Sequence, residues 1–182
     1  MHTPAYGYLT CTFRKEYMEI NVPVHLHNEK YVLTLNAEEN TTDTLYFWQL
    51  YSILGEEQIR QFITQFYENV FNDQDASMFS QTFKNLGDID YHIAGQTNFW
   101  LDLMGGGKRY PGGQFRLERH HNNARQIMNE NGAKRWLGHM RDALVYNIVH
   151  KDPRVKRCII DFVNFFTVKY AKEYNFTLRS KL

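Results

Sequence analysis

The sequence has few cysteines and almost no net charge, and each shortage excludes a class of protein. Among 182 residues there are two cysteines, Cys11 and Cys158, which lie far apart and match no metal-binding or redox spacing. We expect two free thiols in a reducing environment. The 21 basic and 20 acidic side chains leave a formal net charge of +1, without the basic excess typical of nucleic-acid binding.

Long hydrophobic runs and a targeting signal are also missing. No apolar stretch approaches the ~18 residues that cross a membrane. The N-terminus MHTPAYGYLT lacks the charged start and apolar run of a secretory signal. We therefore expect a cytoplasmic protein with no membrane partner, long enough for one domain with a sizeable core.

Aromatic residues, in contrast, are abundant. They make up 15% of the chain, with 13 Phe, 12 Tyr and 3 Trp. Aromatic rings have large apolar faces and few rotamers, so they line a flat apolar cofactor as readily as they fill a core. The composition is compatible with a cofactor site without specifying one.

The first 44 residues differ in pattern from the rest. Apolar and mostly polar residues alternate along Met18, Ile20, Val22, Val24 and Leu26. This period of two, followed by strand formers at 31–35, predicts a β-hairpin that turns at 27–30. The polar stretch 36–44 is expected to be a linker. We therefore divide the chain into an N-terminal extension, 1–44, and a main domain, 45–182.

From residue 45 onward the apolar residues recur at helical spacing. The expected helices are one ending near 72–73, one from Asp88 to the glycines at 105–107, a short one at 114–127, one at 133–149, and a last one opened by Asp152 and Pro153. The sequence predicts an all-α domain behind a short extended segment.

Four polar residues fall on otherwise apolar helical faces: Tyr67, His92, Gln96 and Trp136. Any one of them alone is more simply a core residue with a satisfied polar atom. Together they form a set of hydrogen-bond donors around one cavity. Such donors stabilise the negative charge that a bound diatomic ligand carries on its outer atom.

A histidine pair, His120 and His121, is the candidate metal ligand, because a neutral imidazole is a standard axial ligand to haem iron. His121 has Leu117 four residues earlier and Ala124 three residues later, as expected for a ring beside an apolar cofactor. His120 has polar residues at both of these positions. The pattern therefore favours His121, with His120 as the alternative and Arg119 near the cofactor edge.

The order of motifs resembles that of the truncated haemoglobins over about residues 45–175. The matching pieces are Gly55-Glu56-Glu57, FYENVFND, Phe79, HIAGQTNFW, Gly105-Gly106, Tyr110, LERHH, WLGHMRDAL and KDPR. Trp136 is similar to groups two and three, HIAGQTNFW leans toward group three, and Gln96 is more similar to group one.

The resemblance implies a shortened globin fold, a two-over-two helical sandwich that holds haem b. By the same resemblance, Tyr67, His92, Gln96 and Trp136 match the distal positions, and His121 matches the proximal ligand. Phe79 matches an aromatic residue that packs on the haem, with Phe83 as the alternative. The full set of expected cofactor contacts is Phe79, Phe99, Leu103, Tyr110, Leu117, Arg119, His120 and Met140.

The resemblance further implies reversible binding of O2, NO and CO. NO-detoxifying or peroxidase-like activity would need an external reductase, because the chain has no flavin or nicotinamide motif. A haem-free helical interaction module and a gas or redox sensor domain are the alternatives. The sequence does not indicate an oligomeric state.

Overall fold

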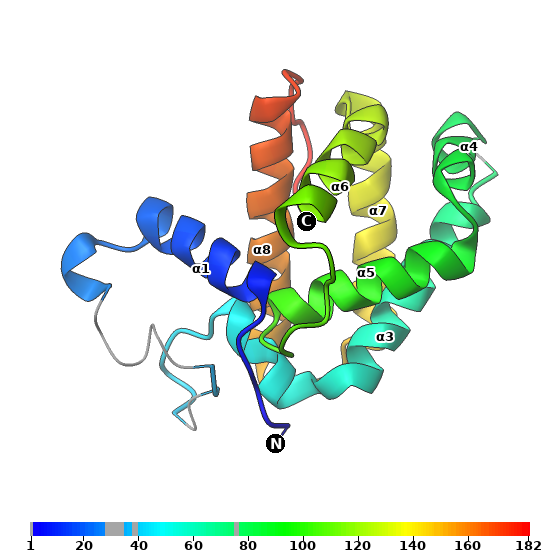
Figure 1. Ribbon diagram of the computed structural model, residues 1–182. Helices are drawn as coiled ribbons and strands as arrows, with labels where there is room; N and C mark the ends of the chain where they lie inside the picture. Colours follow the sequence, from blue (N-terminus) through cyan, green and yellow to red (C-terminus); the bar gives the residue numbers. More distant parts are fainter. Residues whose placement is uncertain (1, 28–34, 38–39, 75–76) are drawn as a thin grey trace.

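A computed structural model describes residues 2–27, 35–37, 40–74 and 77–182 (Figure 1). The α-helices are α1 (Tyr8–Asn21), α3 (Leu50–Phe71), α4 (Ser77–Leu86), α5 (Ile89–Leu103), α6 (Gly113–Ile127), α7 (Glu130–Asn147) and α8 (Pro153–Glu173). Short 3-10 helices lie at Val24–Leu26 and Phe47–Gln49. Within these ranges there is no strand, only one isolated bridge between Ala5 and Gly106. The all-α prediction is confirmed.

The helices form two crossing groups. Figure 1 shows α6, α7 and α8 standing side by side, with α3 and α5 running across them and α1 and α4 on opposite flanks. Helix α3 is central, because it packs against both α5 and α7. None of the helices in the described ranges is long and apolar enough to cross a membrane.

Helical periodicity places α3 as expected. Its residues Ile59, Ile63, Phe66 and Val70 are all buried, and the helix ends at Phe71 with Asn72 as the C-cap. Gly55 has φ +70°, a left-handed conformation that favours glycine, and it kinks the first turns of α3. The kinked helix brings its buried face against the core.

Helix α5 begins and ends where the sequence predicts. The Asp88 side chain caps it by accepting a hydrogen bond from the Tyr91 backbone N–H at 2.7 Å. The chain turns away at Gly105, where φ is +90° and a Cβ atom would lie 2.2 Å from the carbonyl oxygen of Trp48. No side chain fits that approach, so the glycine fixes how closely the end of α5 packs.

The predicted N-terminal hairpin is wrong in its first strand. Residues 18–21 are the last turn of α1, and residues 24–26 form a 3-10 turn. The alternation was misleading because it does not mark a buried face: Ile20 is 63% exposed and Val24 is 80% exposed. The expected second strand lies, apart from Leu35, outside the described residues.

The N-terminal extension instead contributes a helix to the core. Phe13 of α1 packs among Phe47, Phe162, Phe165 and Phe166. At the same interface an ion pair joins Glu16 of α1 to Lys169 of α8 at 2.8 Å.

Candidate functional site

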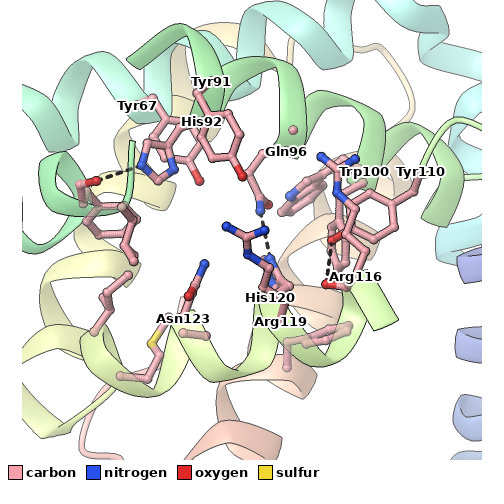
Figure 2. A pocket seen from close by; sticks show the side chains of 18 of the residues that line it. Tyr67, Tyr91, His92, Gln96, Trp100, Tyr110, Arg116, Arg119, His120 and Asn123 are labelled. Carbon is pink, nitrogen blue, oxygen red and sulfur yellow. Dashed lines mark hydrogen bonds between the residues drawn. The ribbon is translucent and has the colours of Figure 1, made fainter. Parts of the chain in front are cut away.

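A cavity of about 500 Å³ lies between α5 and α6, and residues of α3, α4, α7 and α8 also line it. Figure 2 shows Tyr91, His92 and Gln96 on one side of it, facing Arg116, Arg119, His120 and Asn123 on the other. Residues singled out from the sequence that line it are Tyr67, His92, Gln96, Phe99, Tyr110, Arg119, His120 and Trp136. The cavity therefore brings together all four expected donor residues.

Tyr67 contributes a phenol from α3. Its side chain is buried, and the ring stacks on His92 with 5.1 Å between the centroids. Burial raises the pKa of Tyr67 far above its usual value, so the hydroxyl keeps its proton. Within the described part of the chain this hydroxyl makes no hydrogen bond, and it is therefore free to donate one to a ligand in the cavity.

His92 is held in place by the chain itself. Its Nε2–H donates to the carbonyl oxygen of Phe83 at 2.8 Å. Burial lowers the pKa of His92, which keeps the imidazole neutral. In this orientation the Nε2 of His92 is occupied by the hydrogen bond to Phe83 and cannot bind a ligand. The ring of His92 instead packs against the ring of Tyr67.

His120 faces α5 across the cavity. Its Nδ1 lies 3.2 Å from the Nε2 of Gln96, and its ring stacks on Phe99 at 4.8 Å. Burial, together with the neighbouring charges of His121 and Arg116, lowers the pKa of His120 to about 4. Because the amide of Gln96 can only donate through Nε2, the neutral ring presents an unprotonated nitrogen toward α5.

His121 points elsewhere, because adjacent residues on a helix lie about 100° apart. It is half-buried, does not line the cavity, and has its ring 5.9 Å from that of Tyr170. Its backbone carbonyl accepts a hydrogen bond from the Tyr174 hydroxyl at 2.8 Å. The structure thus brings the other member of the pair, His120, to the donor residues.

Two arginines flank the cavity on α6. Arg116 lies with its guanidinium carbon 4.8 Å from the centre of the Tyr110 ring, and the Tyr110 hydroxyl donates to the Arg116 carbonyl at 3.3 Å. Arg119 lines the cavity one turn before Asn123. These side chains give one edge of an otherwise aromatic cavity a positive charge, which favours an anionic group there.

Several expected cofactor contacts lie away from the cavity. Phe79 stacks on His139 with 5.9 Å between the centroids, and its alternative, Phe83, lines the cavity instead. Leu103 and Met140 are core residues, and Leu117 packs against that core. Leu103 and Met140 are buried on the apolar faces predicted for α5 and α7, but at these positions the faces pack into the core and not against the cavity.

One wall of the cavity was not predicted from the sequence. This wall is formed by Trp100 of α5 and by residues of α8: Phe162, Val163, Phe166 and Tyr170. The last helix was predicted, but the spacing of its apolar residues gives no signal that part of it borders a cavity. In the described ranges, no group of three or more His, Cys, Asp or Glu side chains could hold a bare metal ion.

Comparison with known proteins identifies the family. The model of the bacterial-like globins matches residues 49–171, from just before α3 into α8. The match covers more than half of the chain, and the protein belongs to this family. No curated protein matches the chain significantly.

Proposed function

We propose that this protein is a haem-binding globin that holds haem b between α5 and α6 and binds diatomic ligands there. The observation that carries the proposal is the position of His120, a neutral imidazole on the cavity wall opposite Tyr67 and Gln96. Membership of the bacterial-like globins supports it. On this proposal His120, rather than His121, binds the iron.

The residues around the cavity fit such a cofactor. Aromatic side chains such as Phe99 and Tyr110 supply flat apolar walls, and about 500 Å³ lies within the usual range of cofactor pockets. A carboxylate-bearing edge would find Arg116 and Arg119 as partners. A single imidazole ligand suits a metal that is already held by a macrocycle.

The distal residues account for ligand binding. Haem, when bound, supplies an iron that takes up O2, NO or CO reversibly. The Tyr67 hydroxyl is the donor that would stabilise negative charge on a bound ligand, and Trp136 and Gln96 lie on the same cavity. His92 acts on Tyr67 by holding its ring.

Within the globins, we assign this chain to the truncated type, because the order of its motifs resembles that family. Oxidation of NO or reduction of peroxides would draw electrons from an external reductase, because the chain carries no flavin or nicotinamide motif. The haem-free interaction module predicts instead that Tyr67, His92 and Gln96 only fill the core.

An absorption titration tests the proposal. The purified chain is mixed with hemin, reduced, and exposed to CO, and the Soret band is followed. We expect saturation at one haem per chain and a clean shift with CO. Binding without stoichiometry, or none after reconstitution, would contradict the proposal and favour the interaction module.

A further inference from the structure

Asp102, in the last turn of α5, is completely buried and yet does not line the cavity. Its Oδ1 accepts hydrogen bonds from the backbone N–H groups of Leu9 at 2.9 Å and Thr10 at 3.1 Å. A buried carboxylate requires such donors, and a negative charge is stabilised at the N-terminus of a helix. The carboxylate therefore anchors the first turn of α1.

The approach of α1 to α5 is unusually close. A Cβ atom on Gly7, the residue before α1, would lie 2.1 Å from Oδ1 of Asp102, so only glycine fits there. Just before it, Ala5 exchanges backbone hydrogen bonds with Gly105 and Gly107 at 2.8 and 2.9 Å. The N-terminal segment is thus fixed to the end of α5 by several independent contacts.

The same carboxylate reaches the cavity wall. Its Oδ2 accepts a hydrogen bond from the backbone N–H of Tyr110 at 3.3 Å. The Tyr110 ring meets Phe99 edge-on at 5.3 Å, and Phe99 stacks on His120 at 4.8 Å. The Tyr110 hydroxyl also donates to the carbonyl of Arg116, one helical turn before His120. Asp102 therefore touches α1 on one side and supports His120 on the other.

We propose that Asp102 is a positioning residue that couples the docking of α1 to the orientation of His120. Helix α1 precedes the residues that match the family model, and it contacts the cofactor site from outside that region. The inference rests on the proposed function, in which His120 binds the haem iron. If α1 detaches, the Asp102 carboxylate loses the two backbone donors of α1, and Tyr110 and Phe99 no longer hold the His120 ring in place.

Matched substitutions test this coupling in the full chain. Asp102→Asn alters the carboxylate, and Thr10→Val removes the hydroxyl that donates to the Asp102 carbonyl oxygen. Thr12→Val is the control, because Thr12 is exposed and, among the described residues, its hydroxyl bonds only to the Tyr8 carbonyl within α1. Two signals are measured: the ring-proton chemical shift of His120 before hemin is added, and the rate of haem loss afterwards.

We expect Asp102→Asn to move the His120 resonance and to speed haem loss about tenfold, at the low end of what losing an outer-shell partner of a metal ligand costs. Thr10→Val should act in the same direction, more weakly, and Thr12→Val should leave both signals unchanged. If Asp102→Asn does not fold, the comparison of Thr10→Val with Thr12→Val shows whether α1 is coupled to His120.

The two proposals fail in different ways. If the unmodified chain takes up no haem, the proposed function is wrong, while the His120 resonance still reports whether Asp102 affects that ring. If haem binds but Asp102→Asn and Thr10→Val leave the resonance and the rate of haem loss unchanged, the coupling is wrong and the proposed function stands.

Discussion

Gln96 of α5 and His120 of α6 meet across the cavity, with 3.2 Å between Nε2 and Nδ1. Any cofactor that His120 binds on this side must separate the two side chains. The hydrogen bond between them therefore opposes cofactor entry while it orients the imidazole.

From this contact we predict that Gln96→Leu speeds hemin uptake. A neutral hydrogen bond contributes about 0.5–1.5 kcal/mol, which corresponds to roughly a three- to tenfold faster association. Stopped-flow mixing with hemin measures the rate. Asn98→Leu is the control, because Asn98 lies on the same helix and does not line the cavity. Equal rates for Gln96→Leu and the unmodified chain would show that the contact does not limit entry.

Tyr67→Phe should speed the release of O2. A hydrogen bond to a charged group contributes about 1.5–3 kcal/mol, so we expect an off-rate roughly 10- to 100-fold higher. Stability should change little, because within the described residues the hydroxyl has no partner to lose. The rate is measured by replacing O2 with CO. Tyr146→Phe is the control, because Tyr146 of α7 is 76% exposed and does not line the cavity. An unchanged off-rate would exclude Tyr67 as the donor.

Most helices that carry the site were predictable because their buried faces repeat every three or four residues, as in α3, whereas α4 was not predicted. The N-terminal region was not, because Met18 to Leu26 alternate in hydrophobicity without forming a buried face. In α1 the burial of Leu9 and Phe13 follows helical spacing, but the alternation that runs past the helix end obscured it. The packing of α1 against α5 and α8 favours a helix over a strand in this region.

The sequence pattern favoured His121 as the ligand, whereas His120 is the histidine that lines the cavity. The reason for this difference is another one. Apolar neighbours pointed to His121, but the cavity is lined by Arg116 and Ala124, each four residues from His120. A long arginine stem can lie along an apolar wall while its charged end stays over the Tyr110 ring. Residue type alone therefore could not identify which face of α6 borders the cavity.

Asp73 provides a prediction about pH. This carboxylate is buried just after α3 and accepts hydrogen bonds from Arg135 and His139 of α7. The hydrogen bond from Arg135 is the largest reason that the pKa of Asp73 is well below its usual value. Asp73→Asn should lower the free energy of unfolding at pH 7 by about 2 kcal/mol, since charged hydrogen bonds are lost.

The sign of the pH dependence follows from the lowered pKa. The unfolded chain takes up the Asp73 proton more readily than the native chain, so stability falls as the pH falls. The contribution is complete above the unfolded pKa of ~3.9 and is lost as the pH drops from there through the native pKa. Urea unfolding between pH 7 and pH 3 should show the variant and the unmodified chain converging on the acid side. A constant difference would contradict this role.

The most direct test of the central claim compares His120→Ala with His121→Ala in the same haem and CO titration. The two variants change neighbouring residues of one helix, of which His120 lines the cavity and His121 does not. We expect His120→Ala to lose stoichiometric haem and its CO spectrum, with partial recovery when free imidazole is added, and His121→Ala to retain both. Loss in His121→Ala with retention in His120→Ala would contradict the assignment of His120 as the iron ligand.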